Sequence, residues 1–298
     1  MSVTRRHAAV AVATALALGA LPATATTAEA KPLRNGIIAY AVQRCSDPNQ
    51  FLDCSSRIHM VGPKGRAHRR LPCSEGPSGA CSDRYPRFSP NGGRLATVND
   101  AEVADNYVSI RTLRGDVVSR LLVREGVSDF AWGPQSDRFA VNDFERIRLL
   151  ERSTGEFRPY RRTGGVDVAW SRQGRLAWTN DPAEDLMVAD RKLQVRRYNI
   201  RGGASRPDWS PDGRRLAFLS NLRGAAYVIN ADGTGRRLLN RRCATTTTSS
   251  LAWSPDGRKV ACDTAGGDLL SVDVRTRRGK VLVRNIYPLD IDWQPRPR

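Results

Sequence analysis

The sequence predicts an all-β protein, a six-bladed β-propeller whose first and last strands pair in one blade. Three observations predict it: a repeat of roughly 40 residues, turn motifs that divide each repeat into four short strands, and two chain ends that read as complementary parts of one repeat. The chain has 298 residues, which is enough for one large all-β domain.

Residues 206–239 form the clearest repeat. Trp209 ends a first strand, and the Ser-Pro-Asp-Gly turn at 210–213 has proline and glycine where a type I turn favours them. A second strand at 216–219 is apolar on both faces, as expected of a strand buried between neighbouring sheets. A third strand at 225–230 and a short charged fourth strand at 236–240 complete the unit.

An aromatic residue ends the first strand of six repeats, at intervals of 38 to 44 residues. These anchor aromatics are Phe88, Trp132, Trp170, Trp209, Trp253 and Trp293. Because they share one phase, we expect them to pack between blades and not to form an exposed stacking site. Six anchors predict six blades. The strand at Trp293 has nothing after it, and residues 35–42 read as a second strand with nothing before it, so the two are expected to close the ring and remove two sheet edges.

The unit Trp-Ser-Pro-Asp-Gly, followed by an apolar strand, an Asp-Gly turn and a basic-apolar strand, resembles the TolB-type propeller repeat, the WD40-like repeat of TolB and of prolyl-oligopeptidase propellers. The resemblance covers residues 34–298 and is clearest around Trp209 and Trp253, whereas the turns after Trp132 and Trp170 depart from it. It implies a propeller that binds partners in the cell envelope, as TolB binds an envelope lipoprotein and peptide segments. We expect neither the α/β domain of TolB nor an α/β-hydrolase domain here, and therefore a lone propeller.

Residues 1–30 are expected to be a signal peptide and residues 31–298 the propeller domain. Arg5 and Arg6 precede an apolar stretch at 8–21, and the small residues Ala28 and Ala30 fit a cleavage site. The Sec route, the twin-arginine route and an uncleaved anchor stay open as alternatives. The protein is expected to be exported and to be secreted, periplasmic or at the cell surface.

Six cysteines lie beyond the expected signal peptide, and an even number in an exported chain suggests disulfides. The pairing between nearest cysteines would be Cys45–Cys54, Cys73–Cys81 and Cys243–Cys262. A zinc site is the alternative. It is weakened by the lack of a Cys-x-x-Cys pair and by the presence of only two histidines in this part of the chain, His59 and His68.

The position three residues before each anchor aromatic is a candidate ligand site. It begins the innermost strand, near one mouth of the channel where the six strands converge. The residues at this position are Tyr85, Asp129, Asp167, Arg206, Ser250 and Asp290. Carboxylates and a guanidinium in a narrow mouth would shift one another's pKa values and would suit a ligand, a cation or a peptide. The alternative is charge that solvates the channel entrance.

A second row of polar residues follows the second strand of three consecutive blades. Asp100, Asp143 and Asp181 each come directly after an asparagine. Carboxylate oxygens are ligands that Ca²⁺ prefers, so these three residues are a candidate metal site and Ca²⁺ is the candidate cofactor. Ordinary turn chemistry, in which Asn and Asp bond to nearby backbone, is the alternative.

The formal net charge of +18 has two interpretations. Arginine on outer strands prevents edge-to-edge aggregation of sheets. It would also attract an anionic cell-wall polymer or a membrane surface. Nucleic acid is disfavoured as a partner, because the sequence shows neither a basic helix nor a basic strand interleaved with aromatics.

Motifs that carry catalysis, such as Gly-x-Ser-x-Gly, His-Glu-x-x-His and a phosphate-binding glycine loop, do not occur in the sequence. The leading hypothesis is therefore a monomeric, non-catalytic binding or scaffold protein that engages an envelope protein or peptide at one face of the channel. The alternative is an enzyme of the propeller lactonase or lyase kind, with a metal at Asp100, Asp143 or Asp181 and a base at Asp129 or Asp167.

Overall fold

The computed structural model describes residues 33–45, 54–74, 82–99, 106–123, 126–143, 146–161, 165–180, 185–192, 194–243 and 249–297. All regular elements in these ranges are β-strands, and no helix in them is long and apolar enough to cross a membrane. The expected signal peptide at residues 1–30 lies outside the described residues.

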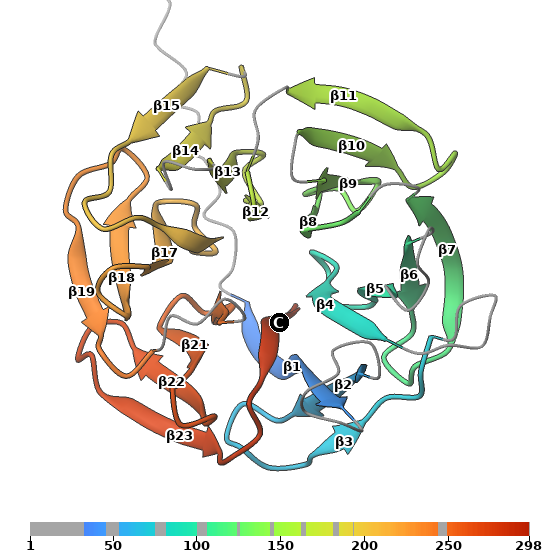
Figure 1. The fold of residues 1–298 in the computed structure, drawn as a ribbon, viewed down its shortest axis with the longest axis horizontal. Helices are drawn as coiled ribbons and strands as arrows, with labels where there is room; N and C mark the ends of the chain where they lie inside the picture. The colour runs from blue at the N-terminus through green and yellow to red at the C-terminus, as the bar shows by residue number, and fades with distance from the viewer. Residues whose placement is uncertain are drawn as a thin grey trace, which may run out of the picture. The chain divides into compact units, whose positions relative to one another are not determined.

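Six antiparallel four-stranded sheets follow one another around a central axis (Figure 1). Blade 1 consists of β24 (Leu289–Arg296), β1 (Arg34–Cys45), β2 (Cys54–Val61) and β3 (Arg69–Arg70). Blade 2 consists of β4 (Asp83–Phe88), β5 (Leu95–Asn99), β6 (Asn106–Arg111) and β7 (Val117–Val123). Blade 3 consists of β8 (Asp129–Trp132), β9 (Arg138–Asn142), β10 (Ile147–Glu151) and β11 (Phe157–Arg161). Blade 4 consists of β12 (Val168–Trp170), β13 (Leu176–Thr179), β14 (Leu186–Ala189) and β15 (Val195–Tyr198). Blade 5 consists of β16 (Ser205–Trp209), β17 (Arg215–Ser220), β18 (Ala225–Asn230) and β19 (Arg237–Asn240). Blade 6 consists of β20 (Leu251–Trp253), β21 (Lys259–Asp263), β22 (Leu269–Asp273) and β23 (Gly279–Val283).

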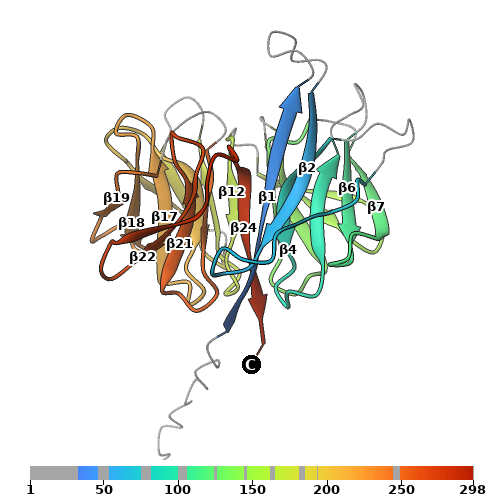
Figure 2. The same ribbon diagram turned by 90° about the horizontal axis from the view of Figure 1, so that it is seen from below.

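Blade 1 closes the ring with the last strand of the chain. β24 pairs antiparallel with β1, with Ile38 opposite Trp293 and Ala39 opposite Asp292. The two strands run side by side through the centre of the side view (Figure 2). The prediction of six blades closed by the two chain ends is therefore confirmed.

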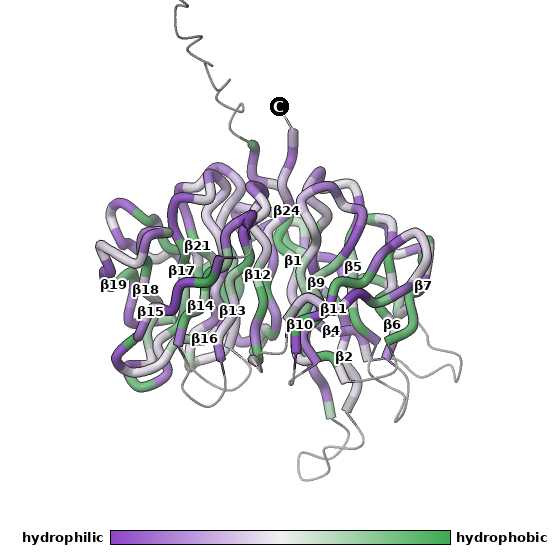
Figure 3. Tube along the Cα trace, turned by 90° about the horizontal axis from the view of Figure 1, so that it is seen from above, coloured by the Kyte–Doolittle hydropathy of each residue, from purple (hydrophilic) through white to green (hydrophobic). Residues whose placement is uncertain are grey.

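The hydrophobic core is divided into six clusters, and each lies between two neighbouring blades. The cluster between blades 5 and 6, for example, joins Leu219 and Val228 to Trp253 and Val272. Every anchor aromatic packs in or against one of these clusters, and Trp132 lies with its ring 4.3 Å from that of Phe139. The anchors are thus packing residues, as the shared phase indicates. Figure 3 shows the resulting pattern, with hydrophobic stretches along the strands and hydrophilic stretches concentrated in connections.

The Ser-Pro-Asp-Gly turns are held by their own side chains. Asp212 accepts hydrogen bonds from the hydroxyl of Ser210 (2.6 Å) and the amide of Arg214 (3.0 Å). Gly213 has φ 66°, and a Cβ there would meet the amide of Gln173 in blade 4. We call the end of the propeller that carries these turns the turn face; the first strand of each blade ends there, and so does the C-terminal end of β24.

The one disulfide whose two halves are described links Cys243 to Cys262 with a Cα–Cα distance of 5.6 Å, and this predicted pairing is confirmed. It joins the segment that leaves blade 5 to the second strand of blade 6. Cys45 and Cys73 are also disulfide-bonded. Cys45 stands opposite Cys54 in the β1–β2 register, while Cys81 lies outside the described residues.

Candidate binding site in the central channel

The structure brings together the six residues that lie three positions before the anchor aromatics. Tyr85, Asp129, Asp167, Ser250 and Asp290 are all buried. The guanidinium of Arg206 lies between two of the carboxylates, with Nε 3.3 Å from Asp167 Oδ1 and Nη1 3.6 Å from Asp290 Oδ1. Burial also raises the pKa of Tyr85 to about 12. We call these six residues the inner ring.

Several inner-ring side chains bond to the backbone of the next blade. Asp129 accepts from the amide of Val168 (3.1 Å), Asp167 from the amide of Arg206 (2.8 Å), and Ser250 from the amide of Ile291 (2.9 Å). These bonds cross from blade 3 to 4, from 4 to 5 and from 6 to 1. The inner ring therefore joins blades to one another, a role that neither sequence-based interpretation included.

The position directly before each anchor aromatic supplies the remaining links. Asp292 accepts from the amide of Phe88 (2.5 Å) and Asp208 from the amide of Trp253 (2.6 Å). Arg87 donates to the carbonyl of Phe130 (3.2 Å) and pairs with Asp129 at 2.7 Å. With the inner ring, a polar side chain spans every blade boundary at the axis. This position holds alanine in the other three blades. Alignment of the repeats therefore could have identified Arg87, Asp208 and Asp292 as unusual charged residues, but the sequence analysis considered the inner-ring position instead.

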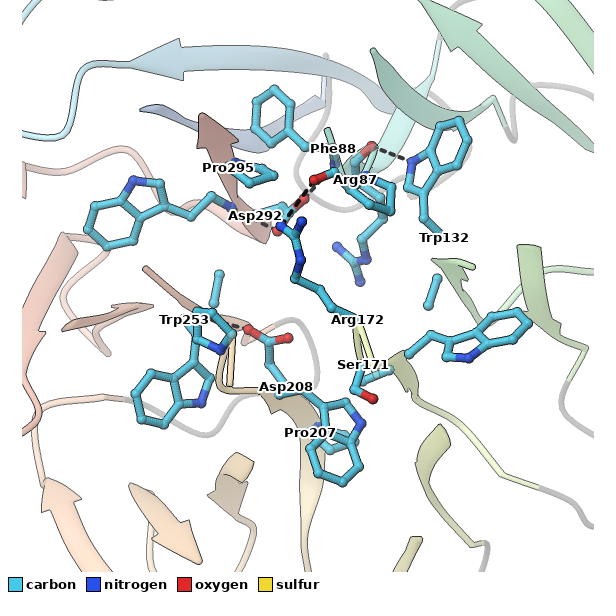
Figure 4. A pocket seen from close by; sticks show the side chains of 18 of the residues that line it. Arg87, Phe88, Trp132, Ser171, Arg172, Pro207, Asp208, Trp253, Asp292 and Pro295 are labelled. Atoms are coloured by element: carbon cyan, nitrogen blue, oxygen red, sulfur yellow. Dashed lines mark hydrogen bonds between the residues drawn. The ribbon is translucent and has the colours of Figure 1, made fainter. Parts of the chain in front are cut away.

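A pocket of about 180 Å³ lies on the axis between the inner ring and the turn face. Its walls come from all six blades and are largely tryptophan and proline. The wall prolines near the turn face are Pro90, Pro134, Pro211, Pro255 and Pro295. Three inner-ring residues, Asp129, Arg206 and Ser250, lie at its opposite end. Figure 4 shows the Arg172 side chain extending into the pocket toward the wall that carries Phe88 and Asp292.

Two carboxyl groups in this pocket, those of Asp208 and Asp292, form no salt bridge with any residue that the structure describes. Burial raises the pKa of Asp208 to about 7 and that of Asp292 to about 6. Neither forms a salt bridge among the described residues, because Arg87 is paired with Asp129 and Arg206 with Asp167 and Asp290. Like charge adds to burial, since Asp292 raises the pKa of Asp208 and Asp129 raises that of Asp292, whereas the charge of Arg87 lowers both. The pocket thus holds two buried carboxyl groups outside the salt bridges, beside aromatic walls.

Arg172 also lines the pocket, and its guanidinium bonds to a wall residue of another blade. Its Nη1 donates to the carbonyl of Pro90 (3.1 Å), so the side chain reaches from blade 4 to blade 2. Burial lowers its pKa. Arg172 therefore crosses the turn-face end of the pocket and leaves Asp208 and Asp292 unpaired.

The candidate Ca²⁺ site is only partly within the described residues. Asp143 is buried, and its Oδ2 lies 3.3 Å from Arg146 Nε and 2.9 Å from Arg148 Nε. Asp100 and Asp181 lie outside the described residues. Among the residues that the structure describes, no three His, Cys, Asp or Glu side chains are grouped so as to hold a metal ion.

A buried ion pair in blade 2 was not anticipated from the sequence. Arg111 Nη1 lies 2.9 Å from Asp83 Oδ2, and both side chains are almost completely buried. Asp83 also accepts from the amide of Ser74 (2.9 Å), and Arg111 donates to the carbonyl of Gly115 (3.1 Å). These bonds tie the strand start, a loop and the third strand together. The pair stabilises the blade and has no contact with the central pocket.

Comparison with known proteins places the fold. TolB from Acinetobacter baumannii superposes with a TM-score of 0.70 at 16% identity, over 88% of this chain and 67% of the TolB chain. The chain folds as a TolB-like six-bladed β-propeller. A chain of a nidogen/laminin complex gives a TM-score of 0.62 at 11% identity, over 87% of this chain and 98% of the other. Virginiamycin B lyase from Staphylococcus aureus gives 0.52 at 12% identity, over 76% of each chain. No protein-family model and no curated protein matches the sequence. At 16% identity, the likeness to TolB shows the fold alone.

Proposed function

We propose that this TolB-like propeller is an exported, non-catalytic binding protein that receives a cationic side chain of a protein or peptide partner in its central pocket. One observation carries the proposal: Asp208 and Asp292 line a pocket formed by six blades, and neither forms a salt bridge with a described residue. Each carboxylate accepts a backbone hydrogen bond but forms no salt bridge, and a buried charge without a counter-charge is costly, so a ligand that supplies the cation gains binding free energy there.

The walls of the pocket favour a lysine or arginine side chain. Both have an apolar stem that packs on aromatic and proline surfaces, and a cationic head that is attracted to the face of tryptophan as well as to carboxylates. The volume of about 180 Å³ is below the range of roughly 300–1,000 Å³ typical of pockets for drug-sized molecules. A single inserted side chain fits this size better than a complete small molecule.

The docking face in this proposal is the turn face. The sequence analysis predicted that a partner docks at the inner ring. Inner-ring side chains are buried, and several bond to neighbouring blades. The pocket extends from them toward the turn face. Ligand contact with the inner ring is thus proposed for the pocket's inner end, at Asp129, Arg206 and Ser250. One of the similar structures is a protein complex, that of nidogen and laminin, which supports a protein partner. The disulfides support export, because such bonds persist in oxidising compartments.

The test uses the oxidised protein purified from its own host and fluorescein-labelled hexapeptides that differ at one central position. Lysine and arginine peptides should bind more tightly than norleucine and glutamate peptides by fluorescence anisotropy. Asp208→Asn combined with Asp292→Asn should weaken the lysine peptide by about tenfold, the effect of losing charged hydrogen bonds. Glu156→Gln, an exposed change on blade 3, is the control. Equal affinity for lysine and norleucine peptides would exclude this pocket chemistry.

An enzyme of the lactonase or lyase kind is the alternative, and one observation favours it. A carboxyl group whose pKa burial raises to about 7, as for Asp208, is suited to general acid–base catalysis at neutral pH. A metal requirement separates the two proposals. Peptide binding that is unchanged by EDTA supports the binding protein, whereas loss of binding or of thermal stability with EDTA supports the enzyme.

A further inference from the structure

A second cavity lies on the turn face between blades 5 and 6, apart from the central pocket. It has a volume of about 550 Å³. Four arginines line it together with one acidic residue: Arg215, Arg237, Arg258, Arg275 and Asp273. Arg215 and Arg237 begin strands of blade 5, Asp273 ends β22 of blade 6, and Arg258 and Arg275 lie in turns of blade 6. We call this cavity the arginine groove.

The single carboxylate of the groove is committed to its own turn. Asp273 Oδ1 accepts from the amides of Arg275 (3.0 Å) and Thr276 (2.7 Å) and from the Thr276 hydroxyl (2.9 Å). These hydrogen bonds, the Thr276 amide first, lower its pKa. None of the four groove arginines forms a salt bridge with an acidic residue in the described part of the chain. The charges of Arg215 and Arg275 act on the carboxylates of Asp212 and Asp273 without ion pairing, so guanidinium donors remain for a ligand.

Blade 3 provides an internal comparison. Arg138 begins the second strand of that blade, the position that Arg215 has in blade 5. Arg138 pairs with Asp137 at 2.9 Å and with Glu151 at 3.5 Å. In blade 5 the residues at the corresponding places are Arg214 and Asn230, so the same strand position lacks both carboxylates. Arg94 in blade 2 and Arg175 in blade 4 have the same position and also form no salt bridge among the described residues, so blade 3 is where carboxylates pair this arginine. What is particular to the boundary of blades 5 and 6 is that three further arginines line the same cavity as Arg215.

Two of the groove arginines are held in place by contacts that leave donors free. Arg237 Nη1 donates to the carbonyl of Val274 (3.1 Å), and both residues belong to the groove. The guanidinium carbon of Arg215 lies 5.0 Å from the centre of the Trp253 ring. Burial lowers the pKa of Arg237, and the charges of Arg215 and Arg277 add to this effect. Like charges are therefore held close together before any ligand arrives.

We propose that the arginine groove binds a phosphate-bearing anion of more than one negative charge. The planar guanidinium presents several N–H donors in a fork that matches the oxygens of phosphate in pairs. A multivalent anion would neutralise the mutual repulsion of the arginines and use donors that the protein leaves free. The site is distinct from the central pocket and does not depend on the function proposed for that pocket. Phosphate of this kind occurs in soluble phosphorylated compounds and in lipid headgroups.

The test is calorimetric titration of the oxidised protein with sodium pyrophosphate, with ionic strength held constant by NaCl. We expect saturable binding that weakens by about tenfold in Arg237→Gln combined with Arg258→Gln, because each change removes charged hydrogen bonds. The matched control is Arg114→Gln combined with Arg223→Gln. It removes the same charge from exposed positions outside the groove and should change the affinity by less than about twofold.

Two further experiments complete the test. The first identifies the source of the phosphate, and the second tests the groove in the wild-type protein without any substitution. Co-sedimentation with vesicles that contain phosphatidic acid, whose phosphomonoester can carry two negative charges, is compared with co-sedimentation with phosphatidylcholine vesicles. It asks whether the groove variant loses lipid binding more than the control variant; a selective loss assigns the phosphate to a headgroup. In the wild-type protein, pyrophosphate should protect Arg258 and Arg275 from phenylglyoxal but not Arg114 and Arg223, as read by peptide mass spectrometry. If the groove and control variants lose pyrophosphate and vesicle binding equally, or if protection is uniform, the proposal is overturned.

Discussion

The central pocket and the arginine groove lie on the same face of the propeller, and the residues outside salt bridges include two carboxyl groups in the pocket and the four arginines of the groove. At the axis the carboxylates outnumber the paired guanidinium groups of Arg87 and Arg206, so Asp208 and Asp292 remain outside the salt bridges of the described residues. In the groove the arginines outnumber Asp273. Trp253 separates the two, since it lines the pocket and also lies against Arg215. The net charge of +18 therefore says little about either site. What distinguishes an arginine that holds blades together from one that is free to bind is the carboxylate beside it.

Arg206→Met is expected to have the largest effect, because it would leave Asp167 and Asp290 buried beside each other without a cation. Breaking a buried ion pair on one side costs about 3–5 kcal/mol, so the free energy of unfolding in urea should fall by that amount. Arg237→Met in the groove removes a charge that other arginines repel and should change it by less than about 0.5 kcal/mol. Similar losses of unfolding free energy in both variants would contradict the distinction between arginines that stabilise the fold and arginines that do not.

Removal of the Cys243–Cys262 disulfide is expected to be the next largest change. The bond links blades 5 and 6, the blades that form the groove. Cys243→Ser combined with Cys262→Ser should lower the free energy of unfolding by about 2–4 kcal/mol under non-reducing conditions. It should also weaken pyrophosphate binding more than lysine-peptide binding, since the central pocket is built by all six blades. Equal weakening of both ligands would show that the two sites are not mechanically separate.

Asp208→Asn should change how stability depends on pH. The unfolded carboxyl ionises near its ordinary pKa of 3.8, whereas the folded protein holds the proton until about pH 7 because burial raises the pKa. The folded state binds more protons between these values, so wild-type stability should fall as the pH rises through this window. Asparagine keeps an oxygen for the Trp253 amide, so the variant should show a flatter curve of melting temperature against pH. Glu156→Gln should follow the wild type, and parallel curves for Asp208→Asn would contradict the raised pKa.

The smallest expected effect is that of salt. Repulsion between exposed and half-buried arginines is screened by ions, so moderate NaCl should raise the wild-type melting temperature slightly. The gain should correspond to about 0.5 kcal/mol or less. It should be reduced in Arg237→Gln combined with Arg258→Gln and retained in Arg114→Gln combined with Arg223→Gln. The same salt gain in all three proteins would place the repulsion outside the groove.

The sequence was sufficient for the fold because the fold depends on short-range signals repeated at a fixed interval. The anchors at Trp209 and Trp253, with the turns after them, define a blade, and the strand at Trp293 without a successor predicts the closure onto β1 that the structure shows. The grouping of the inner ring followed from the same alignment. The bonding of Asp129 and Asp167 to the next blade did not, because it depends on the offset between neighbouring sheets.

The charged residues of the two proposed sites can be read in the sequence, but the sequence alone does not show that they line a pocket or a groove. Asp208 and Asp292 precede anchor aromatics, where other blades have alanine, and only the structure shows that this position lines the pocket. Arg215 and Arg138 look equivalent in the repeat. Arg138 forms a salt bridge with Glu151 of the neighbouring strand, and Arg215 has no carboxylate at the corresponding place. A comparison of the two arginine positions alone therefore cannot distinguish the paired arginine from the unpaired one.

The pairing of β24 with β1 also bears on the order in which the molecule comes into being. β1 pairs with a strand that lies far later in the sequence, and until that strand arrives β1 has an unpaired inner edge and the ring is open on one side. Asp292 and Trp293 are carried by β24, so the central pocket is incomplete before β24 joins the ring. Closure of the ring and assembly of the pocket consequently depend on the same strand pairing, and a protein in which β24 is detached would be recognisable by its open edge.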